Sequence, residues 1–334
     1  MDGLRVAVLV PCFNEEATVA QVVVGMKSAL PTAEIHVFDN NSTDATVEQA
    51  GQAGAVVHRV GRRGKGNVVR RQFSDVEADV YVLVDGDATY HAASAPALVA
   101  EVVAGNDMVV GVRESSGGVG YRPGHAFGNR LLTTFLSRLF GHPCRDILSG
   151  YRAFSRRFVK SFPAHSSGFE IETELTVHAL ELRMPVAEVD TPYVDRPEGS
   201  VSKLNTWSDG ARILRTMLRL FSSERPMAFY GTIAAVLSVV ALALCIPLAV
   251  TYLDTGLVPR FPTLILAVSL VVLASMSALI GIVIDAVARG RRELKTMAYL
   301  QVPAPCRELR VPGPVIQERM TARFANTNHG NACR

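Results

Sequence analysis

The sequence predicts an α/β domain with a mainly parallel sheet, followed by a helical hairpin long enough to cross a membrane. Strand-like and helix-like patterns alternate through residues 1–200, and two long uncharged stretches lie near the C-terminus. The composition agrees with this division, because the 334 residues are 49% hydrophobic and only 19% charged, whereas a soluble domain carries about 25% charged residues. The apolar surplus is too large for a single water-soluble body.

Composition also excludes several classes of protein. Disordered chains are poor in apolar residues, so disorder of the whole chain is excluded. The formal net charge is +3, from 34 Lys and Arg against 31 Asp and Glu, which is too weak and too mixed to indicate a nucleic-acid partner. The five Cys residues are scattered and lack CxxC spacing. They indicate free thiols in a reducing compartment, with neither a disulfide framework nor a zinc site.

Five apolar runs predict the strands of the domain. The spacing within residues 15–30 predicts the first helix, and the capping residues Ser42, Thr43 and Asp44 open the next one. Such alternation predicts a mainly parallel sheet covered on both faces, with ligands bound at the carboxyl ends of its strands. The predicted strands are residues 4–10, 34–38, 55–60, 80–84 and 108–112.

Polar clusters follow four of these strands, at residues 11–16, 39–44, 61–66 and 85–87. Asp85 and Asp87 are the most informative, because two carboxylates one residue apart offer hard oxygen ligands to Mg²⁺ or Mn²⁺. The alternative is a plain acidic turn, and Asp39 and Asp44 are equally compatible with helix caps. The third cluster contains Lys65 between two glycines, but it lacks the GxxxxGK[ST] spacing of a P-loop.

The C-terminal third predicts two membrane spans, at residues 227–253 and 261–284. Each uncharged stretch reaches the roughly 20 residues that cross about 30 Å of hydrocarbon, and helices of a soluble core, the alternative, seldom run so long without a polar face. Arginines flank both outer ends, whereas the connecting loop offers only Arg260. The positive-inside rule therefore predicts cytoplasmic termini, and no signal peptide is visible, so the N-terminal domain is expected on the cytoplasmic face.

The remaining segments complete the predicted organisation. Residues 1–200 are expected to form the α/β domain that carries the candidate site. Residues 201–226 are basic and amphipathic, which predicts an interfacial helix, with a plain domain linker as the alternative. Residues 302–334 lack periodicity and are expected to be a flexible cytoplasmic tail. The sequence leaves a homo-oligomeric state open.

The ordered motifs resemble glycosyltransferase family 2, whose members have a GT-A fold, and in particular the polyprenyl-phosphate glycosyltransferases related to dolichyl-phosphate mannose synthase. The resemblance covers about residues 4–210, and the C-terminal hairpin is similar to that of the membrane-anchored members. Two positions depart from the family pattern: Asn40 stands where many relatives have a second Asp, and Thr89 stands where Gln is frequent. The matching motifs are Val10-Pro11 with Asn14-Glu15, Asp39 with Ser42 and Asp44, the DxD motif at Asp85-Gly86-Asp87, and residues 146–152 and 168–175.

The resemblance implies a site for a nucleotide-sugar donor. A metal ion, Mg²⁺ or Mn²⁺, on Asp85 and Asp87 would bridge the donor diphosphate to the protein. Asp39 would hold the nucleoside base, with Ser42 in the same motif. Lys65 would place a cation near the phosphates. Pro11, Asn14 and Glu15 would line the same cleft.

The chemical class of the acceptor can be inferred from the acidity of the group that attacks the donor. A hydroxyl acceptor needs a general base, whereas a lipid phosphate, with a second pKa near 6, is already ionised and needs cationic side chains to bring it to the donor. We expect Arg113, Arg130 and Arg152 first among these, although a salt bridge is an equal alternative for each. Glu170, Glu172 and Glu174 either position the sugar or acceptor or cap a helix. The wider set of cations comprises Arg113, Arg122, Arg130, Arg152, Arg196 and Lys203.

Together these observations predict an integral membrane glycosyltransferase that inverts the anomeric centre. It would move a hexose from a donor of the UDP-glucose or GDP-mannose type to polyprenyl or dolichyl phosphate, in the assembly of a cell-envelope glycan. One alternative is a polysaccharide or glycolipid synthase of the same fold, but the QxxRW motif of processive synthases is absent around Trp207, the single Trp. The other is a non-catalytic membrane scaffold, against which the intact Asp39, Asp85 and Asp87 argue.

Overall fold

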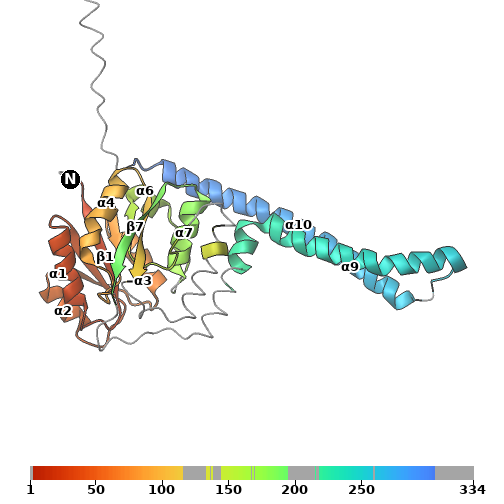
Figure 1. Cartoon of the computed structure of the whole chain (residues 1–334), viewed down its shortest axis with the longest axis horizontal. Coiled ribbons are helices and arrows are strands. Elements are labelled where there is room, and N and C mark those ends of the chain that lie inside the picture. The colour runs from red at the N-terminus through yellow and green to blue at the C-terminus, as the bar shows by residue number, and fades with distance from the viewer. Residues whose placement is uncertain are drawn as a thin grey trace, which may run out of the picture.

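The computed structural model describes residues 3–115, 133–135, 137, 144–166, 168, 170–194, 215, 218–258 and 260–304. These residues form an α/β domain from which a long helical hairpin projects to one side (Figure 1). Among the cations of the predicted acceptor set, Arg122, Arg130 and Arg196 lie outside the described residues. The same holds for residues 201–214, which include Lys203, and for almost all of the predicted tail.

A seven-stranded sheet forms the centre of the domain, in the order β3-β2-β1-β4-β6-β5-β7. β1 to β4 are parallel neighbours, and β5 is parallel to β7, but β6 is antiparallel to both β4 and β5. The expected mainly parallel sheet is therefore present, with one reversed strand inserted. The strands are β1 Val6–Cys12, β2 Glu34–Asp39, β3 Val56–Arg59, β4 Val80–Leu83, β5 Met108–Ser115, β6 Arg152–Ser155 and β7 Val186–Tyr193.

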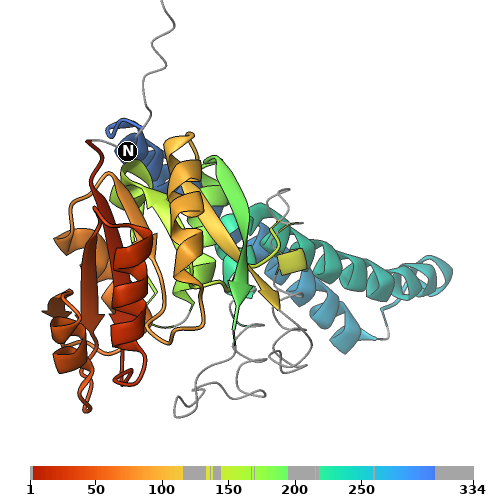
Figure 2. The same cartoon turned by 60° about the vertical axis from the view of Figure 1, so that its left-hand side comes forward.

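Helices cover both faces of the sheet, as the continuous apolar strands require. In β1, Val8 and Val10 join the core beneath α1 and α4, whereas Ala7 and Leu9 join the core beneath α3, α6 and α7. Figure 2 shows α1 and α4 lying over the first of these faces. The helices are α1 Val19–Ala29, α2 Thr46–Gln52, α3 Lys65–Asp75, α4 Ala95–Val103, α6 Arg156–Ser161 and α7 Ile171–Glu181, with a 3₁₀ turn, η1, at Ala92–Ser94.

The strand directions give the sheet two functionally different edges. The carboxyl ends of β1, β2 and β4 lie together, and they carry the segments that follow Cys12, Asp39 and Leu83. The opposite edge holds the first residues of β5 and β7 and the last residue of β6, Ser155. The polar clusters that the sequence places after the strands thus share the first edge.

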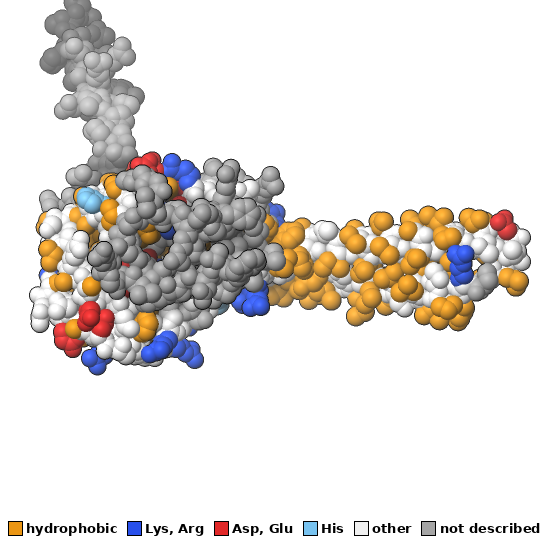
Figure 3. All heavy atoms as spheres, turned by 60° about the horizontal axis from the view of Figure 1, so that its bottom comes forward, with side chains coloured by type: hydrophobic (Ala, Val, Ile, Leu, Met, Phe, Trp, Pro, Cys, Tyr) orange, Lys and Arg blue, Asp and Glu red, His pale blue; other side chains and the backbone are white. Residues whose placement is uncertain are grey.

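The hairpin consists of α9, Pro226–Thr255, and α10, Phe261–Leu300, which are long and apolar enough to cross a membrane. The predicted spans lie within them, but α10 continues as one helix 16 residues beyond the predicted end at residue 284, through charged sequence. Small residues of α10 at seven-residue spacing are buried against α9, namely Ala267, Ala274, Gly281 and Ala288. Apolar side chains cover the outside of the hairpin, with Lys and Arg where it meets the domain (Figure 3).

Candidate active site

The turn after β4, Asp85-Gly86-Asp87, is held by its neighbours on both sides. Gly86 lies against β1, where a Cβ atom would come within 2.6 Å of the Cys12 Sγ atom. The Gly86 carbonyl accepts a hydrogen bond from the buried Thr18 hydroxyl at 2.7 Å, just before α1 begins. A glycine between the two carboxylates is therefore needed for the turn to approach the strand this closely.

Asp87 is buried, and its carboxylate is oriented locally. Its Oδ1 atom accepts hydrogen bonds from the Thr89 hydroxyl at 2.6 Å and from the Thr89 backbone N–H at 3.3 Å. The position at which Thr89 departs from the family pattern thus serves here to fix the direction of the Asp87 carboxylate.

Asp85 is packed against residues from a distant part of the chain. Gly150 lies so close that a Cβ atom there would overlap the Asp85 carboxylate. The Gly150 backbone N–H donates to the buried Tyr90 hydroxyl at 2.8 Å, and the Ser149 hydroxyl donates to the Gly111 carbonyl at 2.6 Å. The predicted motif at residues 146–152 therefore closes over the first carboxylate of the DxD turn.

Lys65, the first residue of α3, bridges two carboxylates. Its Nζ atom lies 2.5 Å from Asp85 Oδ1 and 2.5 Å from Glu172 Oε1 in the first turn of α7. Burial acts to lower the pKa of the Lys65 ammonium, but the charges of Asp85 and Glu172 outweigh it, so that the pKa is raised and the group stays protonated. The second Glu172 oxygen has no hydrogen-bond partner among the described residues.

The loops after β1 and β2 are tied to each other. Asn14 donates its backbone N–H to the Ser42 hydroxyl and accepts at Oδ1 from the Thr43 N–H, both at 2.9 Å. Asn14 has a φ of 54°, a left-handed conformation that Asn tolerates better than most residues. Glu15 donates its N–H to Thr46 at the start of α2, and the buried Asp39 accepts from the Ser42 N–H at 3.1 Å.

Asn40, the other departure from the family pattern, holds the loop that leads to Lys65. Its side-chain N–H groups donate to the carbonyls of Val60 and Arg62 at 3.1 and 2.8 Å, and its Oδ1 accepts from the Gly64 N–H at 2.7 Å. An aspartate cannot donate to the two carbonyls, so the amide is suited to this structural role.

Negative charge gathers around the end of β1. Burial raises the pKa of the Cys12 thiol, and the nearby carboxylates of Glu15, Asp39, Asp85 and Asp87 raise it further. The fully buried thiol is therefore a packing group, and the four carboxylates near it form an acidic cluster at the carboxyl edge of the sheet.

This donor set fits a divalent ion that is shared with a ligand. Among the described residues, no group of three or more His, Cys, Asp or Glu side chains is arranged to hold a metal ion by itself. Mg²⁺ is commonly bound by only one or two carboxylates, with waters and substrate phosphates completing its shell. Asp85 and Asp87 supply hard oxygen ligands of that kind.

The structure places the two described arginines of the predicted acceptor set differently. Arg113, at the end of β5, forms a bidentate pair with Asp146, at 2.6 Å from Nε and 2.8 Å from an Nη atom, and lies over the Tyr193 ring. Arg152 is fully buried and donates to the Ser149 and Ile147 carbonyls and to the Thr176 hydroxyl. Arg152 therefore holds residues 147–149 against α7 and does not face the cleft, contrary to the expectation of an acceptor contact.

Of the three glutamates near residue 170, Glu172 alone is brought to the acidic cluster. Glu174 accepts from the backbone N–H groups of His165 and Ser166, at 2.8 and 2.7 Å, so it fixes the segment before α7. Glu170 occupies the N-cap position of α7. Sequence reasoning left these roles open. It also did not identify Thr18 or Tyr90, whose contacts join segments that are 68 and 60 residues apart in the chain.

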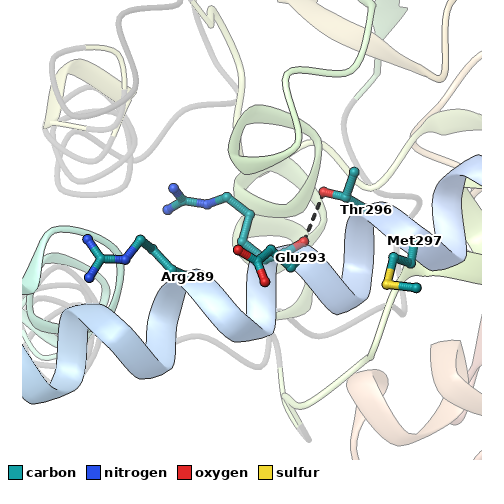
Figure 4. Close-up of a pocket in the computed structure, with 5 residues that line it drawn as sticks. Arg289, Glu293, Thr296 and Met297 are labelled. Carbon is teal, nitrogen blue, oxygen red and sulfur yellow. Dashed lines mark hydrogen bonds between the residues drawn. The ribbon is translucent and has the colours of Figure 1, made fainter.

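A pocket of about 420 Å³ lies away from the acidic cluster, along the charged part of α10. Figure 4 shows Arg289, Glu293, Thr296 and Met297 along this pocket, with the Thr296 hydroxyl bonded to the backbone carbonyl of Arg292 at 2.9 Å. All its described lining residues come from one helix, so it is a surface hollow and not the cleft of the sheet edge.

Comparison with known proteins places this geometry in a family. The model of glycosyl transferase family 2 matches residues 7–162. The glycosyltransferase AglJ of Haloferax volcanii is 33% identical over 250 residues, which cover 73% of this chain and 81% of that protein. A dolichol-phosphate mannosyltransferase of Pyrococcus furiosus is 27% identical over 188 residues, covering 52% of this chain and 53% of that protein.

A solved structure with the same fold carries ligands. The glucosyl-3-phosphoglycerate synthase of Mycobacterium tuberculosis, in complex with Mn²⁺, UDP and glucosyl-3-phosphoglycerate, has a TM-score of 0.53 and 25% sequence identity to this chain. The match covers 66% of this chain and 80% of that one. The described sheet is thus of the GT-A type.

Proposed function

The chain belongs to glycosyl transferase family 2 and is a glycosyltransferase that acts on nucleotide sugars, and from this premise we propose that it transfers a hexose to a polyprenyl phosphate at a membrane surface. The observation that carries the proposal is the union, in one chain, of this domain with a hairpin long and apolar enough to cross a membrane. The similarity to a dolichol-phosphate mannosyltransferase supports the lipid acceptor.

On the donor side, we assign Asp85 and Asp87 to a Mg²⁺ or Mn²⁺ ion that is held together with the donor diphosphate. When bound, such an ion neutralises the charge that develops on the leaving diphosphate. Asp87 is directed by Thr89, and the donor cleft is bounded by residues at the carboxyl ends of β1 and β2 and in the loops that follow these strands. These residues are Pro11, Asn14, Glu15, Asp39 and Ser42.

Lys65 has a role of its own in this assignment. Its ammonium is the counter-ion of Asp85, and a metal ion on Asp85 would take over that charge. Lys65 would then be available to the donor phosphates, as a flexible point charge suits. Glu172 keeps the ammonium at the cleft in either state, because it holds Lys65 from the side of α7.

On the acceptor side, a lipid phosphate needs orientation more than activation, because it is already an anionic nucleophile. Arg113 stands at the end of β5, partly exposed and fixed by Asp146 and Tyr193, so it offers a pre-oriented guanidinium at the rim of the domain. Arg130 lies outside the described residues and stays a candidate for the same task. The burial of Arg152 removes it from the contacts that we propose.

The transfer reaction can be tested with membranes that contain the chain. They are incubated with radiolabelled UDP- or GDP-sugars, undecaprenyl or dolichyl phosphate, and Mg²⁺ or Mn²⁺. We expect label in the lipid extract with one donor; label in no lipid extract would refute the lipid acceptor, and label in a water-soluble product would replace it by a soluble one. The Asp87→Ala variant should insert normally yet transfer no sugar, whereas Asp254→Asn, an exposed carboxylate at the tip of the hairpin, serves as the matched control.

A further inference from the structure

The charged end of α10 joins the hairpin to the α/β domain. Beyond residue 284 the helix continues without interruption to Leu300, and 16 residues of α-helix extend roughly 24 Å. This segment packs against α6 on the domain (Figures 1 and 2). A rigid helix therefore runs from the apolar part of the hairpin onto the surface of the domain.

Tyr299 makes the first of two polar contacts at the end of this helix. Its hydroxyl donates to Asp107 Oδ2 at 2.7 Å, and the Arg157 guanidinium lies over its ring, 4.7 Å from the ring centre. Asp107 is fully buried and also accepts from Ser155 at 2.7 Å and from Arg157 at 2.5 and 2.8 Å. Tyr299 thus completes the set of donors around a buried carboxylate at the start of β5.

Lys295, one turn earlier on the same helix, makes the second contact. Its Nζ atom lies 2.6 Å from Glu181 Oε2, and Arg292 approaches the other Glu181 oxygen at 3.6 Å. The Glu181 side chain is only 4% exposed, so α10 is what covers and neutralises it. Glu181 is the last residue of α7.

These contacts lead from the hairpin to the candidate site. The last residue of α7, Glu181, contacts α10. The second residue of α7, Glu172, holds Lys65 at Asp85. The Asp107 contact lies at the edge of the sheet opposite to the DxD turn. α10 therefore contacts the domain on the side opposite to the candidate site. α7 runs from its contact with α10 to the candidate site.

We propose that Tyr299 and Lys295 are positioning residues that fix the cleft relative to the membrane surface. The inference rests on the proposed lipid acceptor, because only an acceptor confined to a bilayer requires the cleft to be held at a set place. A domain tethered loosely would still bind a nucleotide sugar from solution. It would meet a membrane-bound phosphate in the productive orientation only a fraction of the time.

The kinetic test compares two acceptors, with the wild type and a variant that carries two substitutions, in nanodiscs of the full chain. Lys295→Glu sets a negative charge against Glu181, and Tyr299→Phe removes one donor from Asp107. The combined variant should raise the KM for long-chain polyprenyl phosphate by about tenfold or more while the KM for the donor changes by less than about twofold, since only orientation is lost. With a short-chain, water-soluble polyprenyl phosphate, wild type and variant should perform alike. Equal losses on both acceptors, or no loss on either, would overturn the proposal.

Two controls separate positioning from general damage. Lys295→Arg keeps the charge and should restore the wild-type KM. Tyr252→Phe removes a tyrosine hydroxyl from an exposed position on the hairpin, away from the domain, and should leave both acceptor kinetics unchanged. A raised KM for the long-chain acceptor in either control variant would show that the substitutions act through stability alone.

A spin-label measurement tests, independently of the reaction, whether Tyr299 and Lys295 hold α10 on the α/β domain. Labels at Leu294→Cys on α10 and Val56→Cys on β3, both exposed positions, go into a background without other reactive cysteines. Pulsed EPR should give one narrow distance distribution, which broadens when Lys295→Glu and Tyr299→Phe are added. An unchanged narrow distribution would contradict the docking contacts. If the wild type labels no lipid, the proposed acceptor fails, yet this distance still reports whether the two residues hold the domain.

Discussion

At the scale of single residues, Lys65 is the residue whose role depends most on the fold. The resemblance placed its cation near the donor phosphates, and the structure pairs it with Asp85 and Glu172. Asp85 could be singled out from the sequence because a DxD turn directly follows a buried strand. The partner Glu172 could not be singled out, because it lies 107 positions beyond Lys65 and is brought there by the packing of α7 beside α3.

Removal of this cation should destabilise the domain. In Lys65→Met, the buried Glu172 and the partly buried Asp85 face each other without a counter-ion, and loss of one partner of such a cluster costs about 3 kcal/mol. Chemical unfolding of the full chain measures the difference. The double variant Lys65→Met with Glu172→Gln should recover much of the loss, because it removes one of the two facing charges, and an equally unstable double variant would count against the charge explanation.

Gly150 offers a second test at this scale. A methyl group at this position overlaps the Asp85 carboxylate, so Gly150→Ala should displace that carboxylate or open the 146–152 segment. We expect an affinity for Mn²⁺ with nucleotide that is lower by about tenfold, or about 1.4 kcal/mol, measured by calorimetry. Gly51→Ala in α2 is the matched control, since nothing lies within 4 Å of the added atom, and its affinity should equal that of the wild type.

At the scale of secondary-structure elements, the sequence predicted β1 to β5, including the edge strand β3, and missed the reversed strand β6 and the edge strand β7. Each predicted strand lies at an apolar run, and the central ones among them are apolar throughout because they are covered on both faces. β6 is four residues long and begins with the buried Arg152, and β7 alternates Glu188 and Asp190 with apolar residues at the edge of the sheet. Their pairing depends on contacts distant in sequence, which no local pattern records. The charged sequence beyond residue 284 likewise concealed that α10 continues as a single helix.

The burial of a histidine in α7 predicts a pH dependence. His178 of α7 is buried, with its Nε2 atom 3.0 Å from the Ser161 hydroxyl, and burial, aided by the nearby charge of Lys295, lowers its pKa to about 3. Below pH 6.5, the His178 imidazole therefore binds a proton in the unfolded chain but stays neutral in the folded domain. Stability from this residue is present above pH 6.5 and is lost progressively as the pH falls toward 3.

His178→Gln should flatten that dependence. Between pH 7 and pH 5, the wild type should lose about 2 kcal/mol of unfolding free energy through this residue, whereas glutamine keeps a hydrogen-bonding group and does not titrate. Unfolding of the full chain in nanodiscs at both pH values provides the measurement. A variant with the same pH dependence as the wild type would assign the acid sensitivity to other groups.

At the scale of the whole molecule, the apolar excess of the composition is divided between two places. Part of it fills the two cores of the α/β domain, and part covers the outside of the hairpin. The charged residues divide as well, with carboxylates at the carboxyl edge of the sheet and Arg and Lys on the part of α10 that adjoins the domain. This distribution supports the proposed function, in which a soluble donor binds at the carboxyl edge of the sheet and a lipid acceptor is met at the membrane.

The distribution also predicts the topology of the chain in a membrane. Arg289, Arg291, Arg292 and Lys295 follow the apolar part of α10, whereas Arg260 is the one cation of the turn between the helices. Cationic flanks remain on the cytoplasmic side, so the domain and the docked end of α10 should face the cytoplasm while the turn near Leu257 faces the opposite side. Because α10 is bonded to the domain through Tyr299 and Lys295, the two must lie on the same side.

Single cysteines at two positions test this topology. Leu257 in the turn and Leu294 on the docked part of α10 are both 69% exposed, so an impermeant maleimide should reach them equally once the membrane is breached. In intact cells, Leu257→Cys should be labelled and Leu294→Cys should not, and lysis should make Leu294→Cys reactive. Labelling of both positions before lysis would place them on one side, in which case α9 and α10 would lie along the membrane surface. The exposed apolar residues around the whole circumference of the hairpin argue against that arrangement, because a surface-lying helix needs one polar face.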